Sequence, residues 1–238
     1  MNLASEASTY RIGSWGALVA AVGILFSGPL CLAFVTRYCP QPQWQDPVVF
    51  VQHYDELQNL PYYFGFLIIM GFVIVSSALV ITAEPQHRVF AVCGLVCTVV
   101  FAALISLNYV VQTTFVPGLV RQFDPSSAAT ISAFTMANPA SLGWSLEMWG
   151  YGYLGAATWF SAPTLRRNRL ERITAVLFVL NGCVSVLGAV LTALYSGWVL
   201  TAGGIAAYAV WNALVFAATL LAFLSLRRRA RHLQALTN

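Results

Sequence analysis

Six long apolar stretches, almost free of charge, constrain this chain more than any other feature. They cover residues 13–36, 60–83, 89–112, 141–162, 173–195 and 203–226. An α-helix rises about 1.5 Å per residue, so each stretch can cross a hydrocarbon layer about 30 Å thick. The sequence therefore predicts an all-α integral membrane protein with about six transmembrane helices in one bundle. Because no repeat or linker separates the stretches, residues 1–238 are expected to form a single polytopic membrane domain.

The composition supports this class and excludes several others. Of the 238 residues, 59% are hydrophobic and 8% are charged, whereas about a quarter of the residues of a soluble domain are charged. The chain contains no lysine, which excludes a Schiff-base lysine and a phosphate-binding P-loop. Five scattered cysteines without a CxxC pair indicate neither a disulfide framework nor a zinc site. We expect no nucleic-acid partner, no metal and no cofactor; membrane lipids are the expected surroundings, and the oligomeric state is left open.

The arginines predict the orientation in the membrane. With six spans, ten of the twelve arginines lie on the side of the two termini, and only Arg37 and Arg121 lie on the other side. Arginine-rich loops stay in the cytoplasm. Both termini are therefore expected in the cytoplasm, with the cell membrane as the expected location.

Two links on the outer side, residues 37–59 and 113–140, are long for a compact bundle. Each contains an Asp-Pro pair, Asp46-Pro47 or Asp124-Pro125, which is a typical helix start. We expect short helices in both links, lying in the membrane interface. In the first link the expected apolar face consists of Val49, Phe50, Tyr54 and Leu57.

One acidic residue, Glu147, lies inside a predicted span. It is about 9 Å from the outer end of that span at helical rise. Ionisable groups inside a membrane are costly and therefore indicate function by default. Helical spacing places Trp144 and Tyr151 on the same face, so the carboxyl is expected in an aromatic, partly dehydrated pocket. The alternative is that Glu147 holds span four to a neighbouring helix through hydrogen bonds.

Amide side chains are expected at two depths in the membrane: in the outer third on span three, and near the middle on spans five and six. Asn108 and Gln112 are one turn apart near the outer end of span three and could reach Glu147. Amides bind a carboxyl in either ionisation state, although interhelical packing explains them equally well. Asn181 and Asn212 lie about halfway through spans five and six, and a hydrogen bond between them is expected as a packing contact.

These observations lead to two main hypotheses about function. The first is a noncatalytic protein that binds or transports a small lipophilic molecule in an outer-facing pocket, with Glu147, Trp144, Tyr151, Asn108 and Gln112 as ligand-binding residues. The second is an intramembrane enzyme in which Glu147 donates a proton to start isomerisation or cyclisation of a lipid or terpenoid-like substrate. In that case nearby rings would stabilise the positive charge that develops. A third possibility is a structural subunit of a membrane complex.

Overall fold

The structure is a computed structural model that describes residues 2–237; 86% of the chain is helical, and no described residue lies in a strand. This confirms the all-helical prediction. Six of the helices have at least 20 residues: α1 (Leu3–Leu25), α4 (Leu60–Thr82), α5 (Arg88–Val110), α8 (Leu142–Ser161), α9 (Arg169–Leu194) and α10 (Ala202–Ala235).

Five continuous helical segments are long and apolar enough to cross a membrane. They are Leu3–Tyr38, Glu56–Thr82, Pro85–Arg121, Arg169–Leu194 and Ala202–Ala235. They indicate an integral membrane protein, as the sequence predicted. The remaining predicted span, residues 141–162, corresponds to α8, which is not among these five segments.

Two of the long helices continue past the predicted outer ends of their spans. The first runs through a π-helical turn, η1 (Phe26–Leu30), into α2 (Cys31–Tyr38). The third runs through a second π-helical turn, η4 (Val111–Phe115), into α6 (Val116–Arg121). Pro29 lies inside η1, where the wider turn accommodates the missing backbone donor. The predicted ends were too early because polarity marks where a membrane ends, whereas a helix can continue into water.

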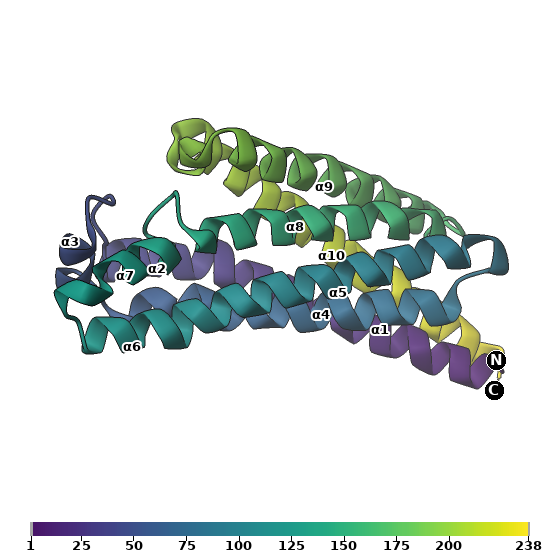
Figure 1. Cartoon of the computed structure of the whole chain (residues 1–238). Helices are drawn as coiled ribbons and strands as arrows, with labels where there is room; N and C mark the ends of the chain where they lie inside the picture. The colour runs from purple at the N-terminus through teal and green to yellow at the C-terminus, as the bar shows by residue number, and fades with distance from the viewer. Residues whose placement is uncertain (1, 238) are drawn as a thin grey trace.

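The six long helices form a closed ring of neighbours. α1 packs against α4 and α10, α5 packs against α4 and α8, and α9 packs against α8 and α10. Figure 1 shows both termini at one end of the molecule and the short helices α6 and α7 at the other. The helices can approach closely where glycines face a neighbour: a Cβ on Gly155 would lie 3.1 Å from the carbonyl oxygen of Gly182. Small residues at such contacts are typical of helix packing in membranes.

The two long links fold together into a small cap, which we define as α3 (Pro47–Gln52), α6 and α7 (Ala128–Phe134). The carboxylate of Asp46 accepts hydrogen bonds from the backbone amides at the start of α3. Phe50, Val116 and Ile131 form the buried centre of the cap, one residue from each of its helices. Phe50 therefore packs on protein within this cap.

The first link does not form one continuous amphipathic helix. The chain leaves the helix after Gln52 and forms a separate 3-10 turn, η2 (Glu56–Asn59). As a result Leu57, which was expected on the same apolar face as Phe50, has 45% of its surface exposed. The break follows from Asp55, whose carboxylate caps the new turn by accepting from the amide of Leu57.

An ion pair holds the opposite end of the molecule together. Glu171 is fully buried in the first turn of α9 and accepts two hydrogen bonds from the guanidinium of Arg229 on α10. Arg229 also donates to the hydroxyl of Tyr10 on α1, at 2.6 Å. Three helices are therefore joined by one buried polar cluster. From the sequence, Arg229 is one of the ten arginines expected on the cytoplasmic side, and no role was predicted for Glu171.

Candidate functional site

Glu147 lies in the second turn of α8 and faces α5. One carboxyl oxygen accepts a hydrogen bond from the side-chain amide of Asn108, at 2.9 Å. The other accepts from the hydroxyl of Tyr109, at 3.2 Å. The expected contact between Asn108 and Glu147 is therefore present. Asn108 is fully buried near the end of α5, so this contact joins two helices inside the molecule.

Gln112 does not bond to Glu147. Its side-chain nitrogen donates to the side-chain oxygen of Asn108 at 3.2 Å and to the carbonyl of Phe134 at 2.9 Å. Its side-chain oxygen accepts from the amide of Met136, at 3.1 Å. Gln112 lies within the π-helical turn η4, and such turns are frequent at functional sites. Gln112 therefore orients Asn108 and ties down the chain that follows α7.

That segment, residues 135–140, crosses close to the carboxyl, and we call it the strap. The indole nitrogen of Trp144 donates to the carbonyl of Met136, at 2.8 Å. The sulfur of Met136 lies 3.1 Å from the amide nitrogen of Asn108 that also donates to Glu147. Trp144 was predicted to contact a ligand. In the structure its indole N–H holds the strap in place.

Tyr151 extends the site from the carboxyl toward α10. Its hydroxyl and that of Tyr109 are hydrogen-bonded at 3.0 Å. Its ring lies edge-on to Trp211, with centroids 4.7 Å apart, and Trp211 in turn stacks with Tyr208 at 6.5 Å. On the other side, the ring of Tyr62 on α4 lies 5.4 Å from that of Tyr109. We call this group the carboxyl site: Glu147, Asn108, Tyr109 and Tyr151, with the rings of Tyr62, Trp211 and Tyr208.

Four of these aromatic residues were not predicted as site residues. Tyr109 directly follows Asn108 in sequence, and this adjacency was the one local signal available. Tyr62 and Tyr208 have no residue of the predicted site next to them in sequence. These rings reach the carboxyl through helix packing, which a single sequence does not specify.

The charge of Glu147 is not balanced by a cationic side chain. None of the ion pairs formed by the described residues includes it, and both of its hydrogen-bond donors are neutral. Glu147 is only partly buried, as are Tyr62, Tyr151 and Trp211. The carboxyl can therefore exchange a proton or meet a ligand without first breaking an ion pair.

The expected hydrogen bond between Asn181 and Asn212 is wrong. Asn181 donates to the hydroxyl of Thr158 on α8, at 3.0 Å, and Asn212 donates to the carbonyl of Tyr208 one turn earlier, at 2.9 Å. The side chain of Asn212 also lies directly against Gly28 of η1. The two amides have similar depths, but they face different neighbouring helices.

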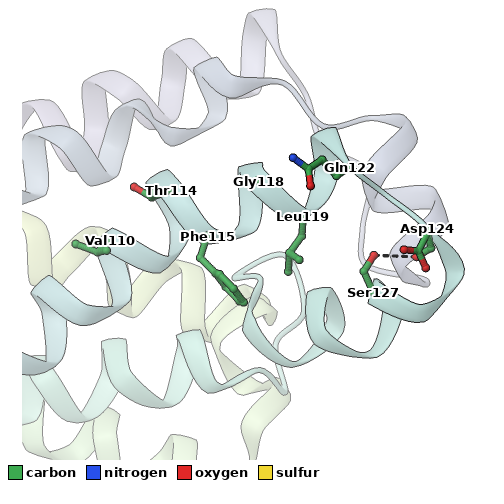
Figure 2. Close-up of a pocket in the computed structure, with 8 residues that line it drawn as sticks. All are labelled: Val110, Thr114, Phe115, Gly118, Leu119, Gln122, Asp124 and Ser127. Carbon is green, nitrogen blue, oxygen red and sulfur yellow. Dashed lines mark hydrogen bonds between the residues drawn. The ribbon is translucent and has the colours of Figure 1, made fainter.

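A separate open groove of about 500 Å³ follows the outer side of α6. Figure 2 shows its lining: Val110, Thr114, Phe115, Gly118, Leu119, Gln122, Asp124 and Ser127. Glu147 is not part of this lining. The groove exists partly because Gly118 has no side chain, since a Cβ placed there would contact nothing within 4 Å.

Within residues 2–237, no three His, Cys, Asp or Glu side chains converge in a way that could hold a metal ion. No protein-family model, curated protein or solved structure matches the chain.

Proposed function

We propose that the protein binds or transports a small lipophilic molecule at the carboxyl site. The observation that carries this proposal is a partly accessible carboxyl that is bonded only by neutral side chains and bordered by aromatic rings. Pockets for small molecules are typically apolar, with a few polar groups that orient the ligand. Glu147 and Asn108 supply the polar groups, while Tyr62, Tyr151 and Trp211 supply apolar surface.

The proposal includes six membrane crossings, with α8 as the fourth. α8 packs against both α5 and α9, and the two termini lie at the same end of the molecule, which requires an even number of crossings. α8 is the one of the six without a stretch apolar enough to indicate a crossing by composition alone, and it carries Glu147 among several glycines and tyrosines. We place the termini in the cytoplasm of a cell-membrane protein, with the cap at the outer surface of the membrane, so that the chain acts as one multi-pass domain.

A second candidate function is acid-catalysed isomerisation or cyclisation of a lipid or terpenoid-like substrate. It is favoured by the rings of Tyr151 and Trp211, which could stabilise a developing carbocation beside the acid. A catalytic cycle also needs a group that takes the proton back. The groups hydrogen-bonded to Glu147 are an amide and a phenol, neither of which is a base near neutral pH. For this reason binding or transport is the primary proposal.

The proposal is tested by identifying the lipophilic molecules that remain bound after gentle purification. Mass spectrometry of the wild type should find a recurrent compound that Glu147→Gln loses and Ser145→Ala keeps. Ser145 is a suitable control because it lies on the exposed side of the same helix turn. Conversion of the compound during incubation would favour the enzyme instead. A well-folded wild type that retains no compound would contradict both the binding or transport function and the enzyme, and would favour a structural subunit.

A further inference from the structure

The carboxyl site combines one acid with several aromatic rings, and this combination is suited to an organic cation. The faces of aromatic rings attract cations, most strongly where water is excluded. Tyr109 and Tyr151 adjoin the carboxyl, because Tyr109 donates to it and the two hydroxyls are hydrogen-bonded. Trp211 and Tyr208 continue the aromatic surface toward the exposed side of α10, where Tyr208 has 44% of its surface accessible.

Glu147 also lacks a counter-ion among the residues that the structure describes. A carboxylate inside a membrane span is costly unless a cation or several strong donors compensate its charge. Glu171, the fully buried acid at the other end of the molecule, has Arg229 as such a partner. Glu147 has none among the described residues, and the arginines lie outside its span.

The groups that face Glu147 from the surrounding elements are all neutral near physiological pH. They are Tyr62 on α4, Asn108 and Tyr109 on α5, Met136 in the strap, Tyr151 on α8 and Tyr208 on α10. Tyrosines lose their protons only near pH 10 in water. Glu147 is therefore the one group of this cluster whose charge changes between about pH 3 and about pH 8.

We propose that the ligand of the carboxyl site is a lipophilic organic cation, which exchanges with the proton of Glu147. This inference rests on the proposed function and names its ligand class. The charge balances: the carboxylic acid releases one proton to solvent, and the carboxylate that remains pairs with the incoming cation. The site is neutral before and after the exchange, so neither state leaves an uncompensated charge in the membrane.

The test compares two probes of nearly the same shape and opposite charge, tetraphenylphosphonium and tetraphenylborate. Equilibrium dialysis of the purified full chain should show that the phosphonium binds at least about tenfold more tightly than the borate. Its affinity should fall by about tenfold or more from about pH 7 to about pH 3, as protons compete for Glu147. Glu147→Gln should lose both the tight binding and its dependence on pH.

Two tyrosine variants separate the aromatic contribution from general folding. Tyr208→Leu removes a ring that stacks with Trp211 and has 44% of its surface exposed, and should weaken phosphonium binding several-fold. Tyr153→Leu changes an exposed tyrosine two residues after Tyr151, which points to another side of α8, and should leave binding unchanged. Melting temperatures of both variants should match that of the wild type.

Equal affinity for the two probes, or phosphonium binding that does not depend on pH, would overturn this inference. If a neutral lipophile is retained in a Glu147-dependent manner while the phosphonium is not preferred, the ligand class is wrong and the proposed function stands. If neither the retained compound nor the phosphonium depends on Glu147, the proposed function fails as well.

Discussion

Arg229 neutralises Glu171 through two hydrogen bonds at the end of the molecule that carries the termini. Glu171 is fully buried, and its remaining hydrogen bonds come from the amide of Arg167 and the side chain of Asn168. The pair connects α9 to α10, while the bond from Arg229 to Tyr10 adds α1. The buried acid at this end of the molecule therefore has a cationic partner, whereas Glu147 at the carboxyl site has none among the described residues.

Glu171→Gln should destabilise the protein strongly. Removing one partner of a buried ion pair typically costs about 3–5 kcal/mol, because the other charge loses its compensation. Unfolding of the variant in detergent should show this loss. Arg228→Gln, at an exposed neighbouring arginine, should change stability by less than about 0.5 kcal/mol. Similar stability of the two variants would show that the buried pair contributes little.

Gly155→Leu should prevent the close approach of α8 and α9. A Cβ at this position would lie 2.7 Å from the side chain of Ser185 and 3.1 Å from the carbonyl of Gly182. Overpacking of this kind typically costs about 1–3 kcal/mol. Gly118→Leu is the matched control, because its added side chain meets open space in the groove. The melting temperature should fall only for Gly155→Leu, and an unchanged value there would refute the tight contact.

The stability of the turn that starts at Asp124 and leads into α7 should depend on pH. Hydrogen bonds from Ser126 lower the pKa of Asp124, so its carboxylate form is favoured in the folded state. The stabilisation is therefore fully present above the pKa of an unfolded aspartate, about 4, and is lost as the pH falls through the lower folded value.

Hydrogen exchange of the backbone amides of residues 126–128 can measure this effect. Their protection should decrease in acid for the wild type. Asp124→Asn keeps a capping oxygen but does not titrate, so its protection should be insensitive in the same range. The same acid-dependent loss in both proteins would exclude Asp124 as its cause.

The proposed topology places the cap and the arginine-rich link on opposite sides of the membrane. Cys39 is buried and is a poor reporter, so an introduced cysteine at the exposed Gln45 is preferable. In intact cells an impermeant thiol reagent should label Gln45→Cys and should not label Arg166→Cys. The reverse pattern would invert the orientation, and labelling of both positions from outside would contradict six crossings.

The helical class and the long apolar helices could be predicted because hydrophobic length is a property of the sequence itself. The contact between Asn108 and Glu147 could also be anticipated, since both residues lie at a similar depth on adjacent predicted spans. The aromatic partners from α4 and α10 could not be anticipated, because they depend on which helices are neighbours in the bundle. For the same reason Asn181 and Asn212 were paired wrongly: depth alone does not specify which neighbour a side chain faces.

The buried ion pair illustrates another limit of the sequence. Glu171 lies in a link rich in arginine, where a solvated charge is the ordinary interpretation. Its burial follows from the length of α10, which continues to Ala235 and brings Arg229 alongside the start of α9. The length of that helix beyond the membrane is not marked by hydrophobicity.

The central claim is that Glu147 is the carboxyl that meets a lipophilic ligand, and chemical labelling tests it most directly. Dicyclohexylcarbodiimide is a lipophilic reagent that reacts with protonated carboxyl groups. Peptide mass spectrometry should find modification at Glu147 and none at Glu171, which is ion-paired and fully buried. The compound retained by the wild type should suppress the labelling when added back. An unlabelled Glu147, or labelling that this compound leaves unchanged, would contradict the account.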